Sequence, residues 1–547
     1  MDRPLESDRT ASGNLRRRLS AGNVVAGAKY KDTVSYSVSD QAQAASTATA
    51  PPTGALTLDE LFRRSVERQP DAIALIDPPN KKRITGSEPL QLTFAEADKA
   101  ISAIATQFTS SGLPLGSIIA VQMPNTVEFA LTALAALRAG LVVALLPQLW
   151  RQSELTTALN RVGARAIVSV SRIEIVDHAD LTLHAAAEAF SIRNVFGFGN
   201  DLPEGMAPLE ILTDGEAETL PAAPADALRP AIVSFDLISE GFRAVPRSHG
   251  QLIAGGLAIA IESGLPQGAR LLSAMAPASF AGFASSIVMW LLNGGSLALH
   301  HPADIPVLEQ QIGAETCDAL IVPGLLALRL AESGAISAQS SIRHVIGLWR
   351  TPDRVGSSDN WHLSKTALTD VYLFGEIGLF GARRLDDGSP AQITSGAINA
   401  PRNAEMSKRI GEIILTPRGT LALRGSMVAL AAYRVTWSKE SFGEPSGPDY
   451  ADTGYAAHID RATGALNITA PPVGIVAVGG YRFLAQDLDE WAKRLTAGAM
   501  LTALPDQLNG FRLAGRASDN RAAREAFGEL GLNPLMGEAF RERSSGT

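Results

Sequence analysis

The stretch IIAVQMPNTVEFALTALAALRAGLVVALL, from Ile118 to Leu146, decides the fold expected of this chain. Two short apolar runs, Ile118–Val121 and Leu141–Leu146, flank a segment that opens at Asn125 with a loose helix-start pattern and closes at Gly140. Parallel strands need a long crossover between them, and a helix of roughly 12 to 16 residues is a typical one. The stretch therefore predicts a βαβ unit with two parallel strands.

The same alternation extends in both directions from this unit. Upstream, Thr57–Glu60 and Thr93–Glu96 are capping boxes, in which a Thr hydroxyl and a Glu carboxylate satisfy exposed N–H groups at a helix start. Helices that alternate with short apolar strands are typical of a parallel sheet covered by helices. We therefore expect a large layered α/β domain. Further strands are predicted at Ala72–Ile76, Ala166–Val170, Leu271–Met275, Leu297–His300 and Ala319–Val322, and further helices at Leu252–Ile261 and Ala281–Leu292.

The residue pattern of the sequence changes after residue 385. Strands punctuated by Gly, Thr and Pro, at Ile410–Thr416 and Thr420–Leu423, predict a β-rich subdomain. Pro471 and Pro472 then form a stiff junction before a small C-terminal segment. The predicted organisation is a disordered tail at 1–55, a large domain at 56–469 and a small domain at 473–547.

Composition and charge narrow the classes of function. The chain has 547 residues, a net charge of −8 and a single cysteine, Cys317. An acidic balance argues against a nucleic-acid surface, and one cysteine cannot form an internal disulfide, which suits the cytoplasm. Arg138 and Gly140 interrupt the longest apolar run, so we expect no membrane span.

Several stretches resemble AMP-forming adenylating enzymes, the family that includes acyl-CoA synthetases and aryl-acid–AMP ligases. TLDELFRRSVERQPDAIALID at 57–77 and the whole of 117–168 are similar to its N-terminal sections. The sequences VPRSH at 245–249 and RLDD at 384–387 most resemble the dihydroxybenzoate–AMP ligase branch of the family. The resemblance implies a large AMP-binding domain, a small α+β lid domain that rotates, ATP and Mg²⁺ as cofactors, and a carboxylic acid as substrate.

The stretch SFDLISEGFRAVPRSH, from Ser234 to His249, is where the family has a glycine-rich loop around the ATP phosphates. Phe235–Ala244 takes the place of that loop, and Ser239, Gly241 and Arg243 are what remains of it. Phosphate binding needs small flexible residues and free N–H groups. Bulky side chains and added negative charge oppose it, and the stretch carries them at Asp236, Leu237 and Glu240.

A second family marker lies at Phe374–Gly378, where the resemblance implies a catalytic glutamate that holds magnesium. If a two-residue deletion is allowed, Glu376 is that carboxylate. Without the deletion, Gly378 takes the glutamate position. A strand-end turn with a solvent-facing Glu376 is the third interpretation.

The ribose and lid markers are also altered. Tyr455 stands where the family has an aspartate that binds both ribose hydroxyls, and Asp452 lies too early to replace it. A phenol cannot make the bidentate contact of a carboxylate. No lysine follows Lys493, although the resemblance implies a catalytic one in the lid. Pro471 and Pro472 restrict the hinge, so we expect one dominant lid orientation.

The resemblance also implies a carboxylic-acid pocket. We expect an apolar pocket between the strand that ends near Met275 and the Tyr372–Gly378 turn, one that Gly295→Phe would fill without loss of the fold. Its lining is expected to include His249, Phe280, Trp349 and Gly375, together with segments at Val233 and Gly294-Gly295.

Three hypotheses follow from these markers. The first is a catalytically impaired adenylating-enzyme homologue that binds an acyl or aryl acid, or a partner such as a carrier protein or an active paralogue. The second is an active acid–CoA or acid–AMP ligase with unorthodox phosphate contacts through Arg243 and Glu376, which alone would need ATP and Mg²⁺. The third is a purely structural subunit.

Overall fold

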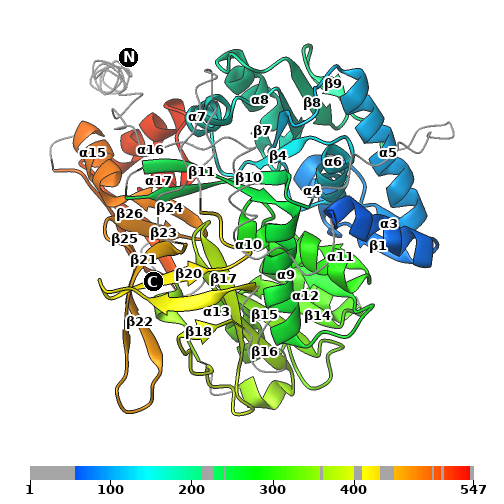
Figure 1. Cartoon of the computed structure of the whole chain (residues 1–547). Coiled ribbons are helices and arrows are strands. Elements are labelled where there is room, and N and C mark those ends of the chain that lie inside the picture. Colours follow the sequence, from blue (N-terminus) through cyan, green and yellow to red (C-terminus); the bar gives the residue numbers. More distant parts are fainter. Residues whose placement is uncertain are drawn as a thin grey trace, which may run out of the picture.

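The computed structural model describes residues 56–211, 227–239, 241–301, 304–314, 316–357, 361–398, 410–430, 449–495, 498–506 and 510–541. The expected tail at 1–55 and Glu240 lie outside the described residues. Figure 1 gives the arrangement of the elements.

The βαβ unit predicted from Ile118 to Leu146 is present as β3 (Ile118–Val121), α6 (Val127–Arg138) and β4 (Val142–Leu145). The two strands pair in parallel, and every residue of α6 is buried. Asn125 does not cap this helix. Its side-chain amide instead donates to the carbonyls of Ser273 and His300, at 3.0 and 2.9 Å. The capping boxes at Thr57 and Thr93 are confirmed.

Strands β3 and β4 lie inside a seven-stranded sheet with the order β11-β10-β4-β3-β5-β8-β9. Its neighbouring strands are parallel except for the antiparallel hairpin of β10 and β11 at one edge. The other elements of this half are α5 (Phe94–Ser110), α7 (Gln152–Val162), β5 (Ala166–Val170), β6 (Arg172–Ile173), β7 (Val176–Asp177), α8 (His178–Ala187), β8 (Asn194–Phe198), β9 (Ala207–Pro208), β10 (Pro230–Ile238) and β11 (Gly241–Ser248).

A second sheet has eight strands in the order β17-β16-β15-β14-β12-β13-β1-β2. Its inner strands are parallel, and an antiparallel strand closes each edge. The strands are β1 (Ile73–Ile76), β2 (Gln91–Thr93), β12 (Leu271–Ser273), β13 (Leu297–Leu299), β14 (Ala319–Pro323), β15 (His344–Trp349), β16 (Ala367–Phe374) and β17 (Gly378–Arg383). The helices are α3 (Leu58–Arg68), α4 (Lys81–Thr85), α9 (His249–Ser263), α10 (Phe280–Phe283), α11 (Met289–Asn293), α12 (Ile305–Ala314) and α13 (Gly324–Glu332).

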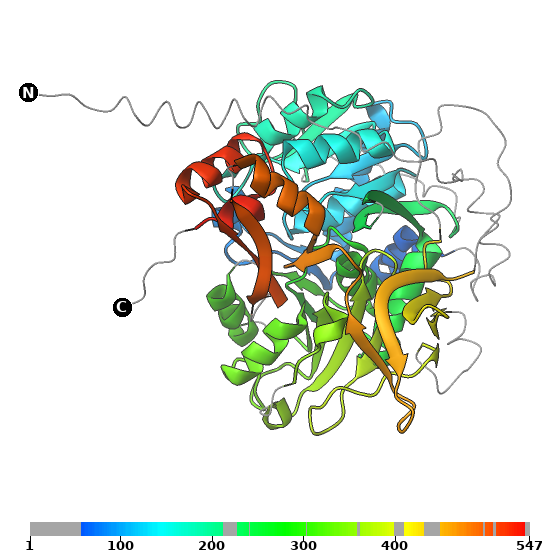
Figure 2. The ribbon, with the colours of Figure 1, turned by 90° about the vertical axis from the view of Figure 1, so that its left-hand side faces the viewer.

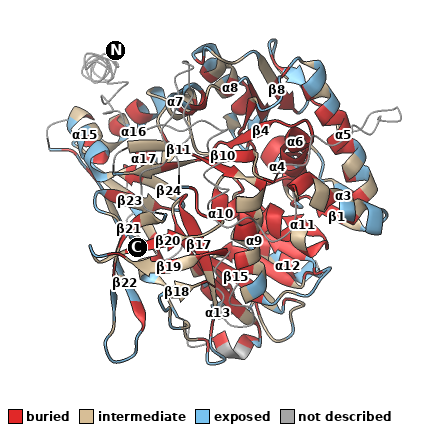
Figure 3. Cartoon of the chain, viewed as in Figure 1, coloured by how far each residue is buried: buried red, intermediate tan, exposed pale blue. Residues whose placement is uncertain are grey.

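Between α10 and α11 the chain makes a π-helical turn, Ala284–Val288, so the helix predicted at Ala281–Leu292 is present with one irregular turn. Two 3-10 turns, Pro352–Arg354 and Trp361–Ser364, follow β15. The helices between the two large sheets are mostly buried, as the red interior of Figure 3 shows for α6, α9 and α11. The predicted layered α/β class is confirmed.

A five-stranded antiparallel sheet forms the β-rich part predicted after residue 385. Its strands are β18 (Gly396–Ala397), β19 (Glu412–Leu415), β20 (Thr420–Arg424), β21 (Ala451–Ile459) and β22 (Leu466–Ala470). We call residues 56–470 the main body.

The chain after Pro472 has a separate hydrophobic cluster that runs from Val478 to Phe540. We call residues 475–541 the C-terminal unit, and Figures 1 and 2 show it against the main body beside α7 and the β10–β11 hairpin. The predicted domain boundaries themselves stay a prediction. The elements are β23 (Ile475–Val478), β24 (Tyr481–Leu484), α15 (Ala485–Leu495), β25 (Met500–Asp506), β26 (Gly510–Arg516), α16 (Asn520–Glu529) and α17 (Pro534–Glu538).

Candidate functional site

The stretch expected to form a phosphate loop forms a β-hairpin instead. Strands β10 and β11 stay paired as far as Ile238 and Gly241, so the loop expected over Phe235–Ala244 is wrong. The reason is packing: the ring of Phe235 stacks on that of Phe242, with 5.3 Å between centroids. Trp150, which precedes α7, packs against both rings at 5.4 and 5.7 Å. Bulky residues that would crowd a phosphate thus form an aromatic cluster.

Asp236 of the hairpin is buried and reaches across to the C-terminal unit. Its Oδ1 accepts a hydrogen bond from Arg482 Nη1 in β24 at 3.0 Å, and its Oδ2 accepts one from the Glu376 backbone N–H at 2.9 Å. Gly375 makes this approach possible, because a Cβ there would lie 2.4 Å from Arg482 Nη1 and 2.5 Å from Asp236 Oδ2. Arg482 also forms a side-chain hydrogen bond with Tyr455. We call this group the ionic contact.

Glu376 is only 7 % exposed, so the solvent-facing interpretation is wrong. Its Oε2 accepts a hydrogen bond from the Phe280 backbone N–H at 2.8 Å, at the start of α10. Arg247 Nη1 lies 3.8 Å from the same oxygen, and its Nη2 donates to the Glu376 carbonyl. Burial raises the pKa of the Glu376 carboxyl, while Arg247 opposes the shift. This carboxylate serves the packing of the turn.

Three other residues of the expected phosphate site lie on the hairpin, and Asp452 of the expected ribose site lies on β21. Ser239 is exposed at the hairpin end, and Gly241 has a φ of +109° at the start of β11. Arg243 pairs in register with Asp236 along the hairpin. Asp452 is engaged within its own sheet, where its Oδ2 accepts hydrogen bonds from Arg418 and Thr420.

The cavity described below does not include three residues expected to line the acid pocket. His249 accepts a hydrogen bond at Nδ1 from the Leu58 backbone N–H at 3.2 Å. The Phe280 ring is fully buried beneath the Arg247 guanidinium, at 3.7 Å. Trp349 donates from Nε1 to Asp370 at 2.7 Å. A Cβ on Gly295 would lie 2.0 Å from the Ala269 carbonyl oxygen, so Gly295→Phe would disrupt the fold rather than fill a pocket.

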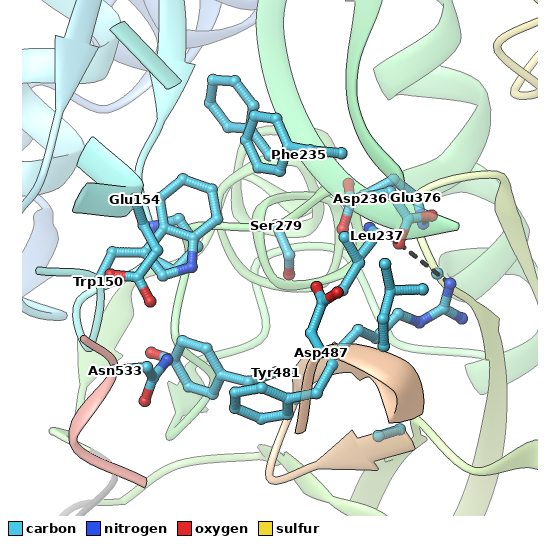
Figure 4. A pocket seen from close by; sticks show the side chains of 18 of the residues that line it. Trp150, Glu154, Phe235, Asp236, Leu237, Ser279, Glu376, Tyr481, Asp487 and Asn533 are labelled. Atoms are coloured by element: carbon cyan, nitrogen blue, oxygen red, sulfur yellow. Dashed lines mark hydrogen bonds and ion pairs between the residues drawn. The ribbon is translucent and has the colours of Figure 1, made fainter. Parts of the chain in front are cut away.

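A cavity of about 340 Å³ lies between the hairpin, the segment before α7 and the C-terminal unit. Figure 4 shows Trp150, Glu154 and Phe235 on the main-body side, with Tyr481, Asp487 and Asn533 of the C-terminal unit facing them. Of the expected site residues, Gly375 and Glu376 line it. The remaining main-body lining is Pro147, Ser153, Asp236, Leu237, Phe242, Ser279, Ala281, Arg350 and Leu373.

A second set of hydrogen bonds joins the two parts on the α7 side of this cavity. The Leu149 backbone N–H donates to the Tyr481 hydroxyl at 3.1 Å. The Glu154 carboxylate accepts hydrogen bonds from the backbones of Arg151 and Asn533. Burial nevertheless raises the pKa of Glu154 to about 7. We call this group the polar contact.

Arg350 is the cavity residue that sequence reasoning missed most plainly. It follows β15 directly, at the carboxyl end of a parallel strand, which is where α/β sheets place ligands. Its side chain lines the cavity, and it makes no hydrogen bond or ion pair with any residue that the structure describes. Its neighbour Trp349 was expected to be one of the residues that line the acid pocket. Position at the strand end was the signal that could have identified Arg350.

The profile of the AMP-binding enzyme family matches residues 62–372. The chain belongs to the AMP-binding enzyme family. It is 26 % identical to a medium-chain fatty-acid–CoA ligase of Escherichia coli strain K12, over 37 % of this chain and 34 % of that enzyme. It is 30 % identical to a 4-chlorobenzoate–CoA ligase of an Arthrobacter species, over 20 % of each chain. The matched parts thus span 34 % and 20 % of these two relatives.

Similarity to solved structures extends over most of the chain. The amide bond synthetase McbA of Marinactinospora thermotolerans superposes with a TM-score of 0.64 at 16 % identity, over 88 % of this chain and 94 % of that one. At this level of identity, the superposition shows a shared fold and nothing finer. Across the residues that the structure describes, no helix has the length and apolarity to cross a bilayer.

Proposed function

We propose that this member of the AMP-binding enzyme family does not form acyl-adenylates from ATP. We propose further that it acts by binding an acyl or aryl carboxylic acid, or a protein partner such as a carrier protein or an active paralogue. The observation that carries the proposal is the ionic contact. It places a buried ion pair between the stretch expected to bind phosphates and the C-terminal unit.

The hairpin engages many of the N–H groups that a phosphate loop would offer. Strands β10 and β11 pair with each other along the expected loop, so their ladder N–H groups are engaged. A phosphate at Asp236 would have to displace Arg482 and would then face a carboxylate. At 4 Å and an effective dielectric of 20 that repulsion is about 4 kcal/mol per charge pair.

Magnesium and ATP, which the family uses, do not fit the residues present. Glu376 is held by Arg247 and the Phe280 N–H, and Asp236 is held by Arg482. The described residues contain no group of three or more His, Cys, Asp or Glu side chains able to hold a metal ion. These contacts argue against the active-ligase hypothesis through Arg243 and Glu376. The cavity favours a binding role over that of a purely structural subunit.

An ATP–pyrophosphate exchange assay with a panel of acyl and aryl acids tests the proposal. The Escherichia coli medium-chain fatty-acid–CoA ligase with medium-chain acids serves as the positive control. We expect exchange at background for this protein and a millimolar or weaker dissociation constant for ATP–Mg²⁺ by calorimetry. Exchange above background with any acid would overturn the proposal.

A further inference from the structure

We propose that strand β25 of the C-terminal unit is the pairing edge of a homodimer. Two copies of this chain join their β25 strands antiparallel about a two-fold axis at Thr502, so that the β25–β26 hairpins form one four-stranded sheet. This inference goes beyond the proposed binding role and does not rest on it.

The outer edge of β25 carries backbone groups that point away from β26. Gly515 of β26 stands opposite Leu501, and its N–H donates outward to the Ala539 carbonyl at 2.8 Å. An antiparallel pair with such an outward N–H exchanges no hydrogen bonds, so the N–H and C=O of Leu501 also point outward. By alternation, the backbone groups of Ala503 and Pro505 do the same. Within the described residues β25 pairs with β26 alone, so this edge is open.

The two-fold register at Thr502 matches these outward groups to one another. It places Leu501 of each copy opposite Ala503 of the other copy. Each of these two pairs exchanges two N–H···O=C bonds, because the donor and the acceptor of both residues point into the new ladder. The edge is therefore self-complementary, as an interface with two-fold symmetry requires.

The same register also matches the exposed side chains. Met500, Thr502 and Leu504 lie on the exposed face of β25, where Met500 and Leu504 are 62 % and 37 % exposed. Across the axis Met500 lies opposite Leu504 of the second copy, and the two Thr502 side chains face each other. Exposed apolar side chains thus cover each other on both sides of the axis. Asp506, the one charged residue of β25, falls opposite Gly498 of the second copy.

Pro505 selects this register over its neighbour. Moving the axis by one residue, to Ala503, would place Leu501 opposite Pro505, which has no N–H to donate. It would also place Met500 opposite the Asp506 carboxylate. The shifted pairing leaves the Leu501 carbonyl without a donor and loses the apolar match. The edge therefore specifies one partner strand, which is its own copy.

The size of this contact determines how tightly the two copies associate. Open edges are where strands add to a sheet, and a two-stranded sheet is stabilised by further strands. A contact between two seven-residue strands is nevertheless small beside the about 1,600 Å² of a standard interface. We therefore expect a reversible dimer with a dissociation constant on the order of 100 µM.

Sedimentation equilibrium of the full chain at about 5 to 300 µM tests the proposal. We expect a monomer–dimer equilibrium for the wild type and at least tenfold weaker association for Leu504→Lys, which places a charge against Met500 of the second copy. Leu385→Lys puts the same charge on an exposed leucine outside the C-terminal unit and should associate like the wild type. A wild type that stays monomeric throughout this range, whatever else binds β25, or equal association of the two lysine variants would overturn the proposal.

A cross-link at the axis tests the register without a change in the apolar contacts. Opposite residues in a non-hydrogen-bonded pair have Cα atoms about 4.5 Å apart, which a disulfide can span. Thr502→Cys should therefore form a disulfide-linked dimer on mild oxidation, in which the native Cys317 takes no part because it is buried. Thr469→Cys, exposed on the edge strand β22, is the matched control and should form no cross-link. Equal cross-linking of both variants, or none of Thr502→Cys, would show that the β25 edges do not meet.

Discussion

The ionic and polar contacts join the C-terminal unit to the main body on different sides of one cavity, and they differ in kind. At the ionic contact, buried Asp236 and Arg482 neutralise each other. At the polar contact, Tyr481 and Glu154 accept hydrogen bonds from backbone N–H groups, and Glu154 forms no ion pair with a residue that the structure describes. The first arrangement is sensitive to the loss of either charge. The second is sensitive to pH.

Of the changes that separate the two contacts, removal of Arg482 should have the largest effect on stability. Arg482→Met leaves Asp236 buried without its cation, and loss of one partner of a buried pair costs about 3 kcal/mol. We expect faster hydrogen exchange in β23 and β24 and earlier proteolysis near Pro472. Wild-type scattering should fit one orientation of the unit, and the variant should need more than one.

Two further variants make that result specific. Arg512→Met removes an exposed arginine from the same unit and should have no effect on exchange. The double variant Asp236→Asn with Arg482→Met should cost less than the sum of the single changes, because no unpaired charge remains. Additive costs would show that the ion pair does not hold the unit.

A smaller effect is expected at the polar contact. Tyr481→Phe removes the hydroxyl that accepts the Leu149 N–H and leaves this donor unpaired. Loss of one such partner costs about 1–2 kcal/mol. Denaturant unfolding followed by tryptophan fluorescence measures it. Tyr372→Phe is the matched control, because the Tyr372 hydroxyl makes no hydrogen bond within the described part of the chain. Equal losses in both variants would contradict the assignment.

The smallest effect is a pH dependence carried by Glu154. Its pKa is raised to about 7 in the folded protein, so the folded state binds more protons than the unfolded state between pH about 4.5 and 7. Stability therefore falls as pH rises through this range, by no more than about 1.4 kcal/mol per pH unit. Glu154→Gln should abolish this part of the slope.

The difference between the wild-type and Glu154→Gln profiles is the quantity to measure. It cancels the opposite contributions of His178 and His301, whose pKa values burial lowers to about 3 and 4. A flat difference curve between pH 5 and 8 would show that Glu154 is ionised throughout that range.

The strands and helices of the fold could be predicted because the sequence patterns that indicate them lie within short stretches of the chain. Apolar runs placed β3 and β5 with their observed ends, and β4 within one residue. The phosphate-loop region was predicted wrongly because the family resemblance favoured a loop over the bulky alternating pattern at Phe235 to Phe242. That pattern is typical of a strand. The same residues make phosphate binding unfavourable there.

The site itself could not be predicted because its contacts join distant segments. Asp236 and Arg482 are 246 residues apart, and neither side chain signals the other. The sequence marks Asp236 as a charge that repels phosphate, and it predicts no role for Arg482. Burial raises the pKa of the Glu376 and Glu154 carboxyls. This burial depends on packing between the main body and the C-terminal unit. The roles proposed for Arg243, His249, Phe280, Trp349 and Tyr455 stay predictions.

The separation of Asp236 and Arg482 also has a consequence during synthesis. A ribosome adds about 5–20 residues per second, so Arg482 emerges on the order of 10 to 50 s after Asp236. The aromatic cluster of Trp150, Phe235 and Phe242 is already translated in that interval. The Asp236 carboxylate can therefore form its ion pair only after β24 has been translated, and a chain that stops before Arg482 lacks that pair.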